Sequence, residues 1–210
     1  MNLPAQAPDA ANAAAGAIVP SKFAHFVIRT ANFAPMLAWY RKVFHMRTSF
    51  EAPVIAFLTY DDEHHRIALI NTPHLPKPER LGTGVDHVAY SYASLPDLLN
   101  SYARLKGEGI LPFWCINHGP TTSMYYRDPD GNEIEFQVDN YPTLAETTAY
   151  FHSAAFAANP IGVEYDPDVL LQKFRSGVPL AELHKQGVAP LPPGKGRDLS
   201  QLMPPPPGAQ

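Results

Sequence analysis

The stretch HGPTTSMYYRDPDGNEIEFQVDNY, residues 118–141, holds the signals that decide the fold. A β-rich run at 123–127 leads into the sequence DPDG at 128–131, and a second run at 133–138 alternates polar and apolar residues. Asp, Pro and Gly favour turns, because Pro presets φ and Gly accepts positive φ. The stretch therefore predicts a β-hairpin.

The second strand of this hairpin has one apolar and one polar face, because side chains alternate along a strand. The apolar face holds Ile134, Phe136 and Val138, and the polar face holds Glu133, Glu135 and Gln137. A carboxylate on such a strand, followed by DNY at 139–141, favours a metal ligand or a catalytic acid over a solvated charge.

The hairpin closes the second of two similar modules, and such repeats decide a fold. The first module has a strand at 23–28, an amphipathic helix at 33–44, and three strand-like runs ending near residue 71. The same β-α-β-β-β order returns from Gly84, where His87 follows His25 by 62 positions. Closer to the hairpin the offset is 67, which pairs Glu135 with Ala68.

The repeat predicts an α+β fold in which two tandem βαβββ modules pair into one cupped mixed sheet, plus a C-terminal helical extension. A capping box beginning at Thr143 predicts a helix through about residue 158, and Asp166 with Pro167 predicts a second helix in that extension. The expected divisions are a flexible arm at 1–20, a domain at 21–141 with modules at 21–72 and 84–141, the helical extension at 142–190, and a Pro-rich tail at 191–210.

Three side chains are candidate metal ligands. If the modules pair about a pseudo-twofold axis, His25 and His87 point from equivalent strands into a shared cup, and Glu135 joins them. Two imidazoles and one carboxylate are the set that holds Fe(II) with open positions, and Mn(II) is the alternative metal. Either histidine alone would be read as a core residue, but repeat-equivalent positions favour metal. We expect His64 and His65, in the first module's turn, to be solvated.

Composition excludes several classes of function. The 210 residues carry a formal charge of −4 and no basic runs, so neither nucleic acid nor an anionic membrane is an expected partner. No apolar run approaches the roughly 20 residues that span a bilayer. The start of the chain lacks the basic region of a secretory signal, and the single Cys115 suits a reducing compartment. We expect a cytoplasmic homo-oligomer.

The motifs together resemble the vicinal oxygen chelate (glyoxalase/bleomycin resistance/extradiol dioxygenase) superfamily, and most of all its type I extradiol ring-cleaving dioxygenases. They are AHF at 24–26, DHV at 86–88, NHG at 117–119, YYRDPDGNEIE at 125–135 and DNY at 139–141, so the resemblance covers about residues 22–141. It implies Fe(II)-dependent cleavage of a catecholic ring, with a small aromatic diol and O₂ as substrates.

The resemblance also implies two catalytic residues. His118 corresponds to the family's acid/base histidine, and imidazole exchanges protons readily near neutral pH. Tyr141 corresponds to a tyrosine that hydrogen-bonds a substrate oxygen, although the sequence is equally compatible with a surface position. The aromatic residues Phe113, Trp114, Tyr125 and Tyr126 are expected mostly to pack the sheet.

Ala68 distinguishes between functions. As the repeat partner of Glu135, it stands where a fourth, glyoxalase-like ligand would lie, and alanine cannot coordinate. The metal would keep open positions for a catecholate and O₂, which favours ring cleavage. A metal-dependent lyase, epimerase or hydrolase remains the alternative enzyme class, since fold alone does not decide it. A drug-binding resistance protein, which needs no metal, is the non-enzymatic alternative.

Overall fold

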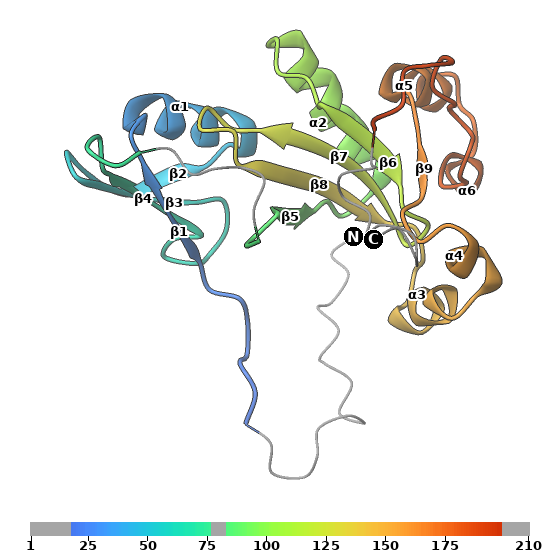
Figure 1. The fold of residues 1–210 in the computed structure, drawn as a ribbon, viewed down its shortest axis with the longest axis horizontal. Coiled ribbons are helices and arrows are strands. Elements are labelled where there is room, and N and C mark those ends of the chain that lie inside the picture. The colour runs from blue at the N-terminus through green and yellow to red at the C-terminus, as the bar shows by residue number, and fades with distance from the viewer. Residues whose placement is uncertain (1–17, 77–82, 199–210) are drawn as a thin grey trace, which may run out of the picture.

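The computed structural model describes residues 18–76 and 83–198 (Figure 1). The first module consists of β1 (Phe26–Thr30), α1 (Phe33–Phe44), β2 (Arg47–Ala52), β3 (Ile55–Thr59) and β4 (Ile67–Asn71). The second consists of β5 (His87–Ser91), α2 (Leu95–Gly107), β6 (Trp114–Asn117), β7 (Thr121–Arg127) and β8 (Glu133–Asp139). The predicted repeat of the βαβββ order is confirmed.

The strands form two sheets, in the orders β1-β4-β3-β2 and β5-β8-β7-β6-β9. In each module the first strand pairs in parallel with the last, and the remaining pairs are antiparallel. The α+β class is confirmed, but the expectation of one shared sheet is wrong for the described residues. Within them, β1 and β5 are edge strands of separate sheets, because side-chain packing rather than strand pairing joins the modules.

Each module's helix covers one face of its own sheet, because apolar residues at helical spacing form a buried stripe. The buried residues of α1 are Met36, Leu37, Tyr40 and Val43, and those of α2 are Leu95, Leu98, Leu99, Tyr102 and Leu105. Figure 1 shows α1 and α2 on the same side of the two sheets. One core on the helix side therefore serves both modules.

The end of α1 packs against the second sheet. The Phe44 ring lies 4.4 Å from the ring of Tyr90 and 5.0 Å from that of Phe136, measured between centroids. The Arg104 guanidinium donates to the carbonyl oxygen of Val43 at 2.8 Å, next to this aromatic group. These contacts hold the modules side by side.

The carboxylate of Asp128 organises the hairpin turn. It accepts hydrogen bonds from the backbone N–H groups of Asp130 and Asn132, at 3.0 and 2.8 Å, and from the Asn132 side chain at 2.8 Å. The Tyr40 hydroxyl donates to it at 3.1 Å from the other module. Burial raises the pKa of this carboxyl despite those hydrogen bonds. Asp128 thus closes the hairpin and also anchors α1.

The C-terminal extension comprises α3 (Leu144–Phe151), α4 (Ala154–Ala158), β9 (Val163–Glu164), α5 (Pro167–Arg175) and α6 (Leu180–Leu183). Thr143 and Asp166 cap α3 and α5 as predicted. The expected continuous helix to about residue 158 is instead two short helices, because Ser153 caps a new one. β9 adds a fifth strand to the second sheet. Within the described ranges, no helix is long and apolar enough to cross a membrane.

The expected N-terminal arm and Pro-rich tail are described only in part. Residues 1–17 and 199–210 lie outside the described residues. Near the C-terminal end of the described residues, the backbone N–H of Arg197 donates to the Glu164 carboxylate at 3.0 Å. The start of the tail therefore turns back onto β9.

The bond between Tyr40 and Asp128 should contribute measurably to stability. Tyr40→Phe should lower the free energy of unfolding by about 1–3 kcal/mol, because it removes a buried donor to a charged acceptor. Tyr126→Phe is the control, since among the described residues the buried Tyr126 hydroxyl has one hydrogen-bond partner, the Met124 sulfur at 3.9 Å. Losing this weak contact should cost about 0.5 kcal/mol. Urea unfolding of both variants measures the difference, and equal losses would contradict it.

Candidate metal centre

His87 and Glu135 meet on the face of the second sheet opposite the helices. β5 and β8 run parallel with His87 beside Glu133, so Glu135 lies two residues further along the same face. The His87 Nε2 atom is 2.9 Å from Glu135 Oε2, and its Nδ1 atom is 2.7 Å from Asp86 Oδ2. The hydrogen bond to Glu135 raises the pKa of His87 to about 9, against the effect of burial and with help from Asp86.

Glu135 is buried, yet it favours the charged form. Burial alone would raise the pKa of its carboxyl, but hydrogen bonds from His87 and Ser123 outweigh burial and leave the pKa lowered. A buried, ionised carboxylate beside an imidazole is a donor pair for a divalent transition metal.

Tyr125 and His118 extend this group. Tyr125 on β7 lies directly opposite Glu135 on β8. The Tyr125 hydroxyl and His118 Nε2 are 3.1 Å apart, and His118 Nδ1 is 2.5 Å from the carbonyl oxygen of Ile161. A carbonyl oxygen only accepts, so Nδ1 carries the hydrogen and Nε2 is left to accept from the Tyr125 hydroxyl. His118 therefore presents a proton acceptor beside Glu135.

Sequence reasoning missed Tyr125, which was expected to pack the sheet. Burial raises the pKa of its hydroxyl, and the nearby charge of Glu135 adds to this, so Tyr125 is a neutral hydrogen-bond donor. The signal that would have found it is the hairpin register. Counting back across the DPDG turn places Tyr125 opposite Glu135.

His25, the third predicted metal ligand, does not lie beside His87 and Glu135. It is exposed just before β1, with its ring 4.2 Å from that of His65 and 6.3 Å from that of His64. His65 is buried and stacks on Phe57 at 4.6 Å, so the expectation that it is solvated is wrong, whereas His64 is exposed. In residues 18–76 and 83–198, no three His, Cys, Asp or Glu side chains lie close enough to hold a metal ion. Of the three predicted ligands, the structure brings together His87 and Glu135, and His25 remains on the first sheet.

Tyr141 packs beside the His118 loop. It follows β8, and its ring lies 5.7 Å from that of Tyr150 on α3. The Tyr150 ring in turn covers Gly119, where an added Cβ would come within 2.2 Å of the Tyr150 hydroxyl. The hydrogen-bonding role of Tyr141 stays a prediction.

Gly162 lets the C-terminal extension reach His118. Its φ of +115° is in the region that favours glycine, and an added Cβ would lie 2.3 Å from the carbonyl oxygen of Asn117 and 2.6 Å from the His118 Cα. This close approach brings the Ile161 carbonyl to His118 Nδ1. The extension thus sets the orientation of the candidate acid/base.

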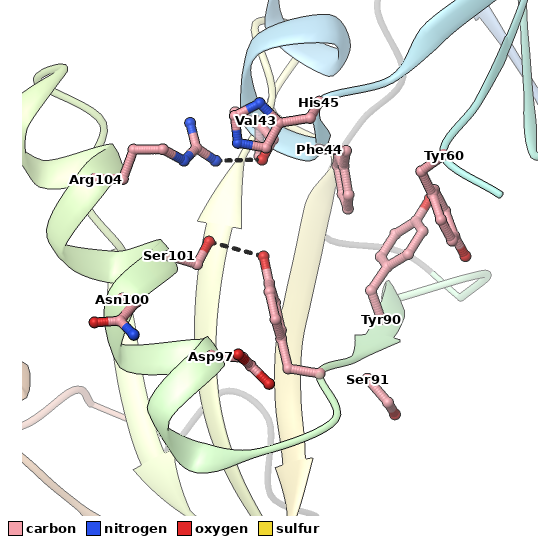
Figure 2. Close-up of a pocket in the computed structure, with 11 residues that line it drawn as sticks. Val43, Phe44, His45, Tyr60, Tyr90, Ser91, Asp97, Asn100, Ser101 and Arg104 are labelled. Atoms are coloured by element: carbon pink, nitrogen blue, oxygen red, sulfur yellow. Dashed lines mark hydrogen bonds between the residues drawn. The ribbon is translucent and has the colours of Figure 1, made fainter. Parts of the chain in front are cut away.

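A cavity of about 540 Å³ opens at the junction of the modules. Figure 2 shows Phe44, Tyr60 and Tyr90 on one side of it and α2 residues on the other. The Ser101 hydroxyl, on the α2 side, is hydrogen-bonded to the Tyr92 hydroxyl at 2.8 Å. Tyr90 lies opposite Phe136, on the helix face of the sheet, whereas Glu135 is on the other face. The sheet therefore separates this cavity from the His87 and Glu135 pair.

Comparison with known proteins identifies the family. The sequence model of the "Glyoxalase/Bleomycin resistance protein/Dioxygenase superfamily" matches residues 22–136. The chain belongs to this superfamily. The family resemblance drawn from the motifs is therefore confirmed.

Two curated relatives come from Rhodococcus globerulus. Biphenyl-2,3-diol 1,2-dioxygenase 2 is 43% identical over 76% of this chain and 84% of its own length. Biphenyl-2,3-diol 1,2-dioxygenase 3 is 41% identical over 79% of this chain and 88% of its own. Among solved structures, the fosfomycin resistance protein from Listeria monocytogenes superimposes with a TM-score of 0.48 at 18% identity, covering 61% of this chain and 99% of that one.

Gly162→Ala should let the His118 ring carry its hydrogen on either nitrogen, instead of on Nδ1 alone. The added Cβ should force Asn117 and Ile161 apart and cost more than the about 1–2 kcal/mol of left-handed backbone strain alone. Gly187→Ala is the matched control, since Gly187 has a φ of +77° and open space around it. NMR of the ring nitrogens should show a protonated Nδ1 in the parent and in Gly187→Ala, and a mixture in Gly162→Ala. An unchanged Nδ1–H signal in Gly162→Ala would contradict the assignment.

Proposed function

We propose that this protein is an Fe(II)-dependent extradiol dioxygenase that cleaves a catecholic ring with O₂. The observation that carries the proposal is the identity of 43% and 41% to two biphenyl-2,3-diol 1,2-dioxygenases over most of the chain. The relatives support a ring-cleaving dioxygenase and an aromatic diol as the substrate class. The arrangement of His87, Glu135, Tyr125 and His118 is chemically suited to it.

The metal would be held by His87, Glu135 and His25. The pair on the second sheet fits a metal by donor chemistry, because a buried carboxylate oxygen and an imidazole nitrogen already converge within 2.9 Å. When bound, Fe(II) supplies the one-electron chemistry that O₂ requires, and Mn(II) is the alternative ion. Among the described residues of one chain, two of these three donors, His87 and Glu135, lie close together.

Position 68 supports an open site. Ala68 lies between Val27 and Phe57 in the register of the first sheet, as Glu135 lies between Ala89 and Tyr125 in the second. The first sheet therefore offers no carboxylate at the equivalent place. A fourth protein ligand of the kind expected in a glyoxalase-like site is missing there.

His118 and Tyr125 would serve the proton-transfer steps, His118 as the proton acceptor and Tyr125 as the group that orients it. A catechol must lose its hydroxyl protons to bind through both oxygens, and the product must regain protons. His118 Nε2 accepts a proton while Nδ1 stays bonded to Ile161, which keeps the ring in place. The buried Tyr125 hydroxyl stays neutral and donates its one hydrogen to His118 Nε2, so it orients the His118 lone pair. Tyr141 would hold the substrate oxygen from the loop after β8.

The remaining expectations also belong to this proposal. They are a vicinal oxygen chelate domain at 21–141, a cytoplasmic location and a homo-oligomer without nucleic-acid or membrane partners. The C-terminal extension is part of the site, because it orients His118 through Ile161.

Anaerobic loading with Fe(II) tests the proposed function. With a panel of catechols that includes 2,3-dihydroxybiphenyl, one O₂ should be consumed for each ring opened, and a coloured ring-opened acid should form. Chelation of the iron should abolish both. Turnover with Zn²⁺, Ni²⁺ or Co²⁺ in the absence of O₂ would overturn the proposal in favour of a lyase, epimerase or hydrolase.

His118→Asn should lower the turnover number by roughly 10²–10⁴-fold, the usual effect of losing a positioned proton-transfer group. Iron content should be unchanged, because His118 is an acid/base here and not a ligand. His74→Asn, at an exposed histidine, is the matched control and should leave turnover intact. Loss of iron from His118→Asn would instead make His118 a ligand, and normal turnover would remove it from the mechanism.

A further inference from the structure

We propose that His184, the residue that follows α6, is a positioning residue that holds the turn carrying His118. The proposal rests on the proposed function, because that function assigns proton transfer to His118. His184 acts through the side chains of Asn117 and Asn140, which hold the backbone on both sides of His118.

His118 lies in the turn between β6 and β7, where the chain reverses its direction. The His118 N–H donates to the Thr121 carbonyl at 2.9 Å, and Gly119 takes a φ of +100°. Carbonyl groups in such a turn are outside the strand ladder and need donors from elsewhere. The position of the turn therefore depends on groups beyond the hairpin.

Asn140, the residue that follows β8, supplies these donors. Its backbone N–H donates to the Pro120 carbonyl at 2.7 Å. Its Nδ2 atom donates to the Gly119 carbonyl at 2.8 Å and to Asn117 Oδ1 at 3.1 Å. Its Oδ1 atom lies 2.8 Å from His184 Nδ1. This one residue thus joins the turn to the C-terminal extension.

The partners of the Asn140 amide fix the direction of each hydrogen bond. The Gly119 carbonyl only accepts, so Asn140 must present Nδ2 to it and Oδ1 to His184. An amide oxygen also only accepts, so the hydrogen of the last pair belongs to His184 Nδ1. His184 is therefore a hydrogen-bond donor to Asn140.

Asn117 closes the network back onto His184. Asn117 is only 4% exposed, so its amide needs partners inside the protein. Its Oδ1 atom accepts from the Gly119 N–H at 2.9 Å, and its Nδ2 atom donates to the His184 carbonyl at 2.8 Å. His184, Asn140 and Asn117 thus form a closed ring in which each residue donates to the next. The ring holds the residue before His118 and the residue after it.

Other residues anchor the C-terminal extension to the rest of the protein. Leu170 and Leu183 are buried in the common core, and the Tyr165 hydroxyl donates to the Ser123 carbonyl at 3.2 Å. The His184 side chain is half-buried and forms its hydrogen bond at the edge of this contact. Loss of that hydrogen bond should therefore loosen the turn and leave the extension in place.

Two substitutions of His184 test whether its donor positions His118. His184→Leu fills similar space but donates no hydrogen, whereas His184→Asn places an amide N–H where Nδ1 was. With iron-loaded enzyme and 2,3-dihydroxybiphenyl, His184→Leu should lower kcat about 10–100-fold, because small misplacements of a reacting group have effects of this size. KM and iron content should stay the same, and His184→Asn should recover most of kcat.

Lys185→Ala is the matched control for these variants. Lys185 is exposed in the same segment and pairs with Glu182, so kcat should be unchanged. Melting temperatures check the fold of each variant. If His184→Leu does not fold, His184→Gln takes its place, because its amide lies one carbon further out than the Nδ1 position.

Amide hydrogen exchange, measured by NMR, reports on the turn without any need for ring cleavage. The Gly119 N–H should exchange about 3–10-fold faster in His184→Leu, which is the usual effect of losing one hydrogen bond. The Gly131 N–H, which donates to the Asp128 carbonyl at 2.7 Å in the other hairpin turn, should exchange at the parent rate.

An unchanged exchange rate at Gly119 or an unchanged kcat in His184→Leu would overturn the proposal. So would an equal loss of kcat in His184→Asn or in Lys185→Ala. A parent protein that does not cleave the ring would refute the proposed function alone, because the exchange rates at Gly119 would still show whether His184 holds the turn.

Discussion

The packing of Phe44 against Tyr90 and Phe136 determines how the rest of the molecule is arranged. It holds the end of α1 on the helix face of the second sheet, and the Asp128 carboxylate reinforces the contact by accepting from Tyr40 at 3.1 Å. Because both helices then share one core, both uncovered sheet faces lie on the opposite side. The separation of His25 from Glu135 follows from this packing and not from the composition of either sheet.

Local structure could be predicted from the sequence where periodicity or capping chemistry controls it. The two βαβββ modules, the hairpin around DPDG and the caps at Thr143 and Asp166 all follow from such signals. The relative position of the modules could not, since it depends on the side of the second sheet against which Phe44 packs. The strand pattern alone is equally compatible with a shared sheet and with two sheets.

The candidate site, too, could be predicted from the sequence only where a repeat or a local pattern places its residues. His87 and Glu135 follow from the repeat, because parallel pairing of the first and last strands brings them to one face. Tyr125 was missed, since a tyrosine in a β-rich run reads as packing until the register shows what lies opposite. The partner of His118 is the Ile161 carbonyl, 43 residues away, and no local pattern reports such a contact.

The central claim is that His87 and Glu135 hold Fe(II) and that His118 acts beside the metal as an acid/base. A crystal structure of the protein loaded with Fe(II) and grown without O₂ tests it most directly, because it shows which side chains bind the metal. The account predicts iron bound by His87 and Glu135, with open coordination positions and with His118 outside the set of ligands. Iron bound without His87 or Glu135, or bound by His118, would contradict it.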